Sequence, residues 1–159
     1  MLTASFVVVG GPTNCSAADQ TDSVPQDTLI TLERTECYGF CPSYKITITA
    51  DGSVTFDGHR FVKQTGIAKS SITQPQVREL VSRFEKINYF SFRDRYESYR
   101  DGCKQWSTDS PTAITSIRIS GKTKSVRHYH GCHGVDELEY LKELEQAIDT
   151  TVNSAQWIR

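Results

Sequence analysis

The sequence predicts an α+β domain with a single antiparallel sheet, built from two hairpin regions, and two amphipathic helices packed on one face of it. Two observations lead to this prediction. Residues alternate between apolar and polar in two separate regions of the chain, and each region is followed by a stretch with helical spacing of apolar residues. Short turns separate the alternating segments. Because short turns join antiparallel neighbours, we expect each region to form hairpins of one sheet.

The N-terminal part reads as a leader and linker, residues 1–27, before a single domain over residues 28–159. The linker is rich in polar residues, which bury too little apolar surface to fold alone. Residues 2–9 form a short apolar run like that of a signal peptide, although no Lys or Arg precedes it. Cys15 stands where a lipoprotein carries its lipid. Residues 12–14 fit a lipidation signal poorly, so Cys15 is expected to be either lipidated or free.

The first hairpin region contains strands predicted at residues 28–34, 44–50 and 53–57. A three-residue turn at 50–52 would pair Ile48 with Val54 and place the apolar residues of both strands on one face. A two-residue turn would place them on opposite faces, so the longer turn is favoured. Gly52 is then expected in the left-handed conformation that such a turn requires. A further turn is predicted at residues 57–58, with another strand starting at residue 60.

Two helices are predicted, at residues 73–87 and 135–152. Thr73 and Gln76 have the spacing of a capping box, and Pro75 is tolerated in a first helical turn. In both stretches the apolar residues recur every three or four positions, which gives each helix one apolar stripe. The stripes consist of Val77, Leu80, Val81, Phe84 and Ile87 in the first helix and of Leu138, Leu141, Leu144, Ile148 and Val152 in the second.

A second hairpin is predicted at residues 112–120 and 123–130. A two-residue turn at Gly121-Lys122 would pair Ile117 with Val126 and keep both on one face. The aromatic residues at 89–92 are expected in the core. At the end of the chain, Trp157 and Ile158 are expected to pack back onto the domain.

Four of the five cysteines lie within the predicted domain and favour an exported, disulfide-bonded protein. Gly39 lies midway between Cys37 and Cys41, so the chain can turn back and bring the sulfur atoms together. Cys103 and Cys132 flank the second hairpin, where a bond between them is easily made. A redox-active or metal-binding role for the first pair is the alternative, although redox pairs usually have two intervening residues at a helix start.

The histidines near the second helix suggest another function. His128 and His130 point to the same side of a predicted strand, and Cys132 or His133 would add a ligand for zinc or another divalent transition metal. Cys132 cannot readily serve both a metal ion and a disulfide with Cys103, so the two predictions compete. A hydrogen-bonded pair of histidines at the rim of the sheet is the other interpretation.

Residues 93–111 form a long polar loop and are the predicted partner-binding surface. Loops of this length without secondary structure are usually functional or disordered, and a disulfide would order this one. Basic and aromatic side chains alternate along it, which suits an anion or a protein partner. A solvated loop without a partner is the alternative. The predicted surface consists of Arg93, Arg95, Tyr96, Tyr99, Arg100 and Trp106.

Charge and motif content argue against several function classes. The chain has 18 Lys and Arg residues against 19 Asp and Glu residues, whereas nucleic-acid binders usually carry a basic excess. Ser43, Ser107 and Ser110 have no motif context of a catalytic nucleophile, and no Gly-rich phosphate loop precedes a helix. We therefore expect a non-enzymatic domain of the cell envelope or periplasm that needs no cofactor and binds a protein or small molecule. A structural role in the envelope is a further option.

Residues 30–44 contain the run Cys37-Tyr38-Gly39-Phe40-Cys41-Pro42 and resemble the opening of a bacterial family of small domains of unknown function, marked by Cys-x-Gly-x-Cys-Pro. The resemblance extends over residues 28–159. Its members are commonly exported proteins or lipoproteins, so the resemblance implies export, and it implies no activity. The matching segments further along the chain are Asp51-Gly52, residues 108–112, residues 121–124 and Trp157-Ile158.

Overall fold

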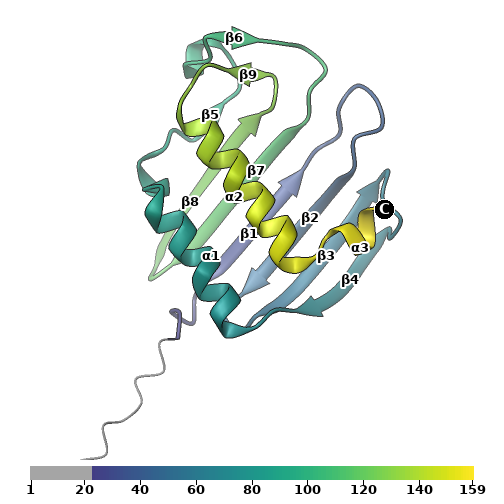
Figure 1. Cartoon of the computed structure of the whole chain (residues 1–159), viewed down its shortest axis with the longest axis vertical. Coiled ribbons are helices and arrows are strands. Elements are labelled where there is room, and N and C mark those ends of the chain that lie inside the picture. Colours follow the sequence, from purple (N-terminus) through teal and green to yellow (C-terminus); the bar gives the residue numbers. More distant parts are fainter. Residues whose placement is uncertain (1–22) are drawn as a thin grey trace, which may run out of the picture.

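The computed structural model describes residues 23–159, which form a seven-stranded sheet with helices on one face (Figure 1). The strand order is β4-β3-β2-β1-β7-β8-β5, and all neighbours are antiparallel except β5 and β8. The apolar run at residues 2–9 and Cys15 lie outside the described residues. The strands of this sheet are β1 (Leu29–Arg34), β2 (Ser43–Thr49), β3 (Ser53–Arg60), β4 (Gly66–Ser71), β5 (Arg95–Tyr96), β7 (Thr112–Ile119) and β8 (Lys122–Tyr129).

Both predicted helices are present, as α1 (Gln74–Lys86) and α2 (Glu137–Val152). They lie side by side on one face of the sheet, and the capping box of Thr73 and Gln76 is formed (Figure 1). A third helix, α3 (Ala155–Ile158), was not predicted. It brings the ring of Trp157 to 4.8 Å from that of Phe56, so the end of the chain packs back as expected. The α+β class is confirmed.

The turn between β2 and β3 has the predicted length. Ile48 pairs with Val54, and Gly52 has a φ of 86°. A Cβ atom at Gly52 would collide with the carbonyl oxygen of Ile72, so glycine is needed here for both its conformation and its small size. The apolar residues of both strands consequently face the helices.

The predicted turn at residues 57–58 is wrong, because β3 continues to Arg60. Gly58 occupies a strand position close to Gln64, where a Cβ atom would collide with the Gln64 carbonyl oxygen. The Asp57-Gly58 pair therefore marks a close approach of the backbone and not a turn. The chain reverses after Arg60, where Phe61 has a φ of 55°, and β4 begins at Gly66 instead of residue 60.

The second hairpin is also shifted relative to the prediction. Its turn is formed by Ser120 and Gly121, both with positive φ, so Ile117 pairs with Lys124 and not with Val126. Asp27 accepts hydrogen bonds from the backbone N–H groups of Ser120 and Gly121, at 2.9 and 2.7 Å. The shift is two residues. Because side chains alternate with period two, the same residues still face the helices.

A single sheet made of two hairpin regions does not describe the whole fold. Residues 93–111 contain β5, which pairs with β8 in parallel, and β6 (Gln105–Trp106), which pairs with β9 (Cys132–His133) in a separate two-stranded sheet. Two short 3-10 helices, Tyr89–Ser91 and Tyr99–Asp101, complete this region. All of these elements are too short to give a periodic sequence signal. The strands among them are formed by pairing with distant parts of the chain.

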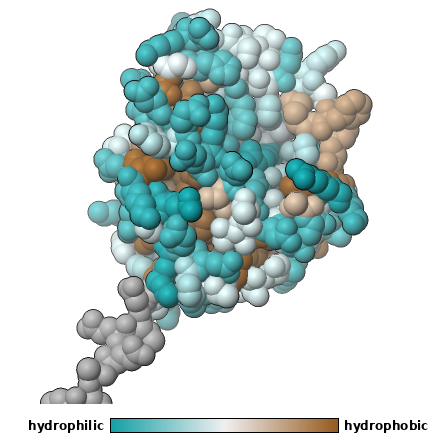
Figure 2. Space-filling model, in the orientation of Figure 1, coloured by the Kyte–Doolittle hydropathy of each residue, from teal (hydrophilic) through white to brown (hydrophobic). Residues whose placement is uncertain are grey.

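The core lies between the sheet and the helices and contains the predicted apolar stripes. On the helix-bearing face hydrophilic residues predominate, and hydrophobic residues are visible only in separate areas (Figure 2). None of the helices described over residues 23–159 combines the length and apolar character that crossing a membrane requires.

Candidate functional site

A row of polar side chains crosses the sheet beneath α2, where the core is otherwise apolar. Tyr44 pairs with Arg34 across β2 and β1, Arg34 pairs with Ala113 of β7, and Ala113 pairs with His128 of β8. Each of these residues lies two positions from a core residue of its own strand, as Arg34 does from Leu32. They therefore share the helix-facing side of the sheet. Ala113 has the smallest side chain of the row and separates Arg34 from His128.

Two carboxylates of α2 face this row. Glu145 and Asp149 are separated by one helical turn and therefore lie on the same side of the helix. Glu145 lies in the buried stripe between Leu141 and Ile148, and its side chain is only 2% exposed. A charge placed so deeply requires partners on the sheet.

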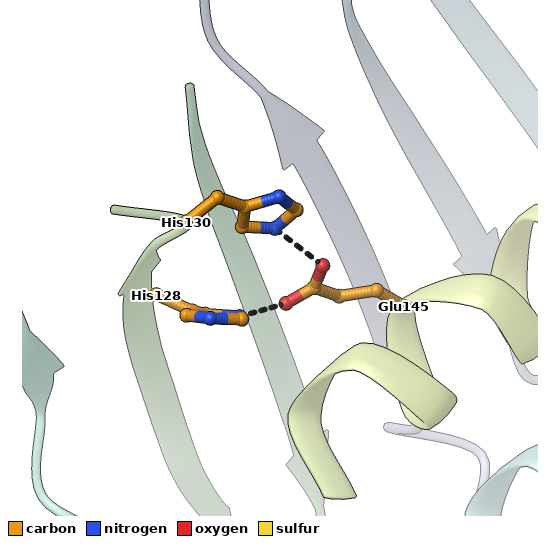
Figure 3. Close-up of side chains that lie close together, drawn as sticks. All are labelled: His128, His130 and Glu145. Carbon is orange, nitrogen blue, oxygen red and sulfur yellow. Dashed lines mark hydrogen bonds and ion pairs between the residues drawn. The ribbon is translucent and has the colours of Figure 1, made fainter. Parts of the chain in front are cut away.

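Glu145 is held by two histidines, as Figure 3 shows. One carboxylate oxygen, Oε1, lies 2.7 Å from Nδ1 of His128, and the other, Oε2, lies 2.9 Å from Nε2 of His130. Nη1 of Arg34 lies 3.4 Å from Oε2. The side chain of His128 is 1% exposed and that of His130 is 28% exposed, so the cluster is reached from the His130 side.

Asp149 forms the second half of the network and positions Arg34. It accepts a hydrogen bond of 2.9 Å from Nε of Arg34, and the same carboxylate oxygen lies 2.8 Å from Nη2 in an ion pair. The hydroxyl groups of Tyr44 and Ser154 donate to its other oxygen, at 2.7 and 2.6 Å. The guanidinium group of Arg34 is thereby directed toward α2, where it contacts Asp149 and Glu145.

Burial and charge act in opposite directions on these groups. Burial alone would raise the pKa of Glu145, but hydrogen bonds from His128 and His130 and their charges lower it from 4.5 to about 2. Burial alone would lower the pKa of Arg34, but the charges of Asp149, Tyr44 and Glu145 together with the hydrogen bond to Asp149 outweigh burial and raise that pKa. Burial and the charge of Asp149 both raise the pKa of Tyr44. Glu145 and Arg34 are therefore both charged at neutral pH.

The second ring nitrogen of His128 indicates the tautomer. Nε2 is buried and has no hydrogen-bond partner among residues 23–159. A proton on that atom would be a buried donor without an acceptor, which costs about 1–3 kcal/mol. The proton is therefore best placed on Nδ1, from which it is donated to Glu145.

The two imidazoles and the carboxylate are also a set of metal ligands. One ligand atom from each of His128, His130 and Glu145 lies within 4.8 Å of the other two. Two histidines and a carboxylate form a common zinc-binding set, with bonds of about 2.0–2.2 Å. An ion between them requires each hydrogen-bonded nitrogen and oxygen to move apart, because two zinc bonds of about 2.0–2.2 Å in a tetrahedral arrangement span more than the present 2.7 and 2.9 Å.

The ligand set differs from the predicted one. Cys132 is bonded to Cys103, and His133 is exposed on β9, where it pairs with Gln105 of β6. The bonded state of Cys132 removes its thiolate, so the structure resolves the predicted competition in favour of the disulfide. Neither residue belongs to the cluster, and Glu145 takes their place.

Both disulfides have the pairing that the sequence analysis favoured. Cys37 and Cys41 are joined with their Cα atoms 5.6 Å apart, and Cys103 and Cys132 with theirs 5.2 Å apart. The second bond attaches the region before β6 to β9. It therefore fixes the long loop close to the strand that carries His128.

The predicted partner surface is only partly at the surface. Tyr96 is completely buried, because β5 pairs it with His128 at the edge of the core, so it does not belong to such a surface. The side chain of Tyr99 is 65% exposed and that of Trp106 42% exposed. The remaining residues of the predicted surface, Arg93, Arg95 and Arg100, are exposed.

The sequence contains signals for Glu145 and Arg34, which were not among the predicted site residues. Glu145 follows Leu141 by four positions and precedes Ile148 by three, so it belongs to the apolar stripe by spacing. Arg34 follows Ile30 and Leu32 in strict alternation. A charged residue at a core position of a predicted element indicates a buried partner.

A family model described as Domain of unknown function (DUF6438) matches residues 28–152. The chain belongs to this family. The comparison with curated proteins gave no match. Membership in DUF6438 confirms the resemblance to a family of unknown function, and it assigns no activity to the cluster around Glu145.

Proposed function

We propose that this chain is an exported, non-enzymatic binding domain whose ligand is a divalent transition metal ion, zinc in the first place, held by His128, His130 and Glu145. The observation that supports this most strongly is the buried carboxylate shared by two imidazole rings. A carboxylate buried so deeply needs compensating positive charge, and a metal ion supplies it.

The charges of the site favour a cation. With neutral histidines, the negative charges of Glu145 and Asp149 exceed the single positive charge of Arg34. The site therefore has a net charge of about −1, counted from the standard charges of these groups. A divalent ion changes this to about +1, the same charge that protonation of both histidines would give, so it replaces two protons.

The cost of binding is smaller than the gain. Coordination through Nδ1 of His128 moves the ring proton to Nε2, which has no acceptor among residues 23–159. This costs about 1–3 kcal/mol. The cost is small on the scale of structural zinc sites in zinc-finger peptides, which gain roughly 10–16 kcal/mol from the ion.

Export is supported by the two disulfides, since such bonds persist in oxidising compartments. The periplasm or cell envelope is therefore the proposed location. A membrane tether through Cys15 remains part of the proposal.

A second candidate function is protein binding through the exposed part of the 93–111 loop. The exposed rings of Tyr99 and Trp106, next to basic residues, favour it. Replacement of Arg93, Arg95 and Arg100 by Ala, followed by co-purification, tests this surface. A set of captured proteins that does not change would exclude it.

Metal analysis and zinc titration calorimetry test the metal proposal on protein purified without chelator. We expect one zinc ion per chain in the wild type and at least a tenfold loss of affinity in the His128→Ala, His130→Ala and Glu145→Gln variants. The His59→Ala and His133→Ala variants are matched controls, because both side chains lie outside the cluster and are exposed. A wild type with both disulfides formed and no zinc binding would refute the proposal.

A further inference from the structure

A cavity of about 200 Å³ lies next to the cluster and is lined by His130 of the cluster and by Arg34, which contacts Glu145. Its other walls are mostly apolar and are formed by Cys41, Pro42, Pro111 and Thr112. Pockets for drug-sized molecules have roughly 300–1,000 Å³. The cavity is therefore suited to a ligand of only a few non-hydrogen atoms.

The polar wall of this cavity can offer hydrogen-bond donors. Nε2 of His130 faces Glu145, and Figure 3 shows the other ring nitrogen, Nδ1, on the side of the ring away from the carboxylate. Coordination of a metal ion by Nε2 places the ring proton on Nδ1. Arg34 donates through Nε to Asp149 and forms an ion pair with it through Nη2, while Nη1 has only the long contact of 3.4 Å with Glu145. Arg34 and His130 thus retain donor capacity.

The charge of the site decides when an anion can bind. Without a metal ion, the negative charges of Glu145 and Asp149 exceed that of Arg34, which disfavours an anion. With a divalent ion the balance reverses to about +1, as counted above. With neutral histidines, an anion in the cavity is therefore attracted when the metal site is occupied and repelled when it is empty.

We infer that the cavity beside His130 binds a small monocarboxylate anion, whose carboxylate group contacts the metal ion and Arg34. The apolar walls of Pro42 and Pro111 favour a short hydrocarbon tail over an inorganic anion. Two histidines and a carboxylate leave a fourth zinc position open, which the anion would fill. This inference rests on the proposed metal site.

Cobalt(II) titration in the presence and absence of acetate tests the inference. Sodium chloride at the same ionic strength is the control. Because coupling between two ligands is reciprocal, we expect acetate to tighten cobalt binding about 5- to 150-fold, and cobalt to tighten acetate binding by the same factor. The visible spectrum of the bound cobalt ion should change when acetate enters its coordination sphere. Cobalt binding that acetate leaves unchanged, or that chloride strengthens equally, would overturn the inference.

Two variants separate the cavity from the metal site. Thr112→Phe narrows the cavity and leaves the three metal ligands intact, and Thr47→Phe makes the same change on β2, outside the cavity lining. We expect Thr112→Phe to bind cobalt normally but to lose the acetate effect, and Thr47→Phe to keep both. An acetate effect that persists in folded Thr112→Phe contradicts the inference. If thermal melting shows that Thr112→Phe is unfolded, the Arg34→Lys variant tests the inference instead. It keeps the positive charge but loses the planar guanidinium group that would contact the carboxylate of the anion.

Absence of cobalt binding in the wild type would refute the proposed function itself, and with it this inference. Normal cobalt binding without an acetate effect would refute only the inference. The two failures are therefore distinguished in the same titration.

Discussion

Nδ1 of His128 and Oε1 of Glu145 are 2.7 Å apart, although His128 belongs to the sheet and Glu145 to α2. This hydrogen bond joins the two layers of the fold within the core. It requires His128 and Glu145 to occupy positions that are otherwise apolar. The residues around Glu145 therefore serve both the packing of α2 and the proposed metal site.

The ion pair of Arg34 with Asp149 should contribute strongly to stability. Replacement of Arg34 by Ala leaves Asp149 and Glu145 without their cation in a mostly buried position. We expect the free energy of unfolding to fall by at least about 2 kcal/mol, measured by urea denaturation. Arg60→Ala is the control, because its ion pair with Glu36 is exposed and should contribute about 0–1 kcal/mol. Equal losses in both variants would show that the buried pair has no special role.

The acid stability of the metal-free protein should depend on Glu145. Its pKa is about 2 in the folded protein and near 4.3 in an unfolded chain. A lowered pKa stabilises the fold fully above the unfolded value, and this stabilisation is lost as the pH falls through the folded value. Between pH 5 and pH 2 the stability of the wild type should therefore fall by about 2–3 kcal/mol more than that of Glu145→Gln.

Urea denaturation in the presence of a chelator, at a series of pH values, measures this difference. Acidic groups remote from Glu145 titrate in the same way in both proteins, so they cancel in the comparison. Parallel stability curves for the wild type and Glu145→Gln would mean that Glu145 is not held as a charged group.

The two disulfides should differ in their contribution. The bond between Cys103 and Cys132 closes a loop with a sequence separation of 29, and that between Cys37 and Cys41 one of 4. Loop-closure entropy then predicts losses of about 3–4 kcal/mol and about 2 kcal/mol when each bond is removed by Ser substitution of both cysteines. Thermal denaturation gives the ranking. A larger loss for the Cys37–Cys41 bond would contradict it.

Ala113 should act as the spacer between Arg34 and His128. A larger side chain at this position would have to displace one of its two neighbours in the row. We expect Ala113→Leu to cost about 1–3 kcal/mol in stability and to weaken zinc binding together with it. Ala68→Leu, at a half-buried position of the edge strand β4, is the matched control and should leave zinc binding unchanged. Normal zinc binding in Ala113→Leu would exclude the spacer role.

The sequence was sufficient to predict the elements with strong periodicity. The stripe from Val77 to Phe84 and the pairing of Ile48 with Val54 follow from local spacing, and both are present. The parallel strand β5 was not predictable, because its two residues are ordered only by pairing with distant β8. Asp57-Gly58 shows the opposite error, since a strong local turn signal yields to the pairing of β3 with β2 on one side and β4 on the other.

The site was predictable only in part. His128 and His130 could be identified because their spacing lies within one strand. Glu145 belongs to another element, and only the packing of α2 on the sheet brings it to the histidines. Cys132 and His133 were more obvious ligands by proximity in sequence, but the disulfide to Cys103 and the reversal of the chain into β9 remove them.

X-ray absorption at the zinc edge of the loaded protein tests the central claim most directly. Coordination by His128, His130 and Glu145 predicts only nitrogen and oxygen neighbours, at about 2.0–2.2 Å, with the scattering pattern of two imidazole rings. The imidazole signal should weaken in His130→Ala and persist in His133→Ala. A sulfur neighbour at about 2.3 Å, or a spectrum without imidazole, would contradict the proposed site.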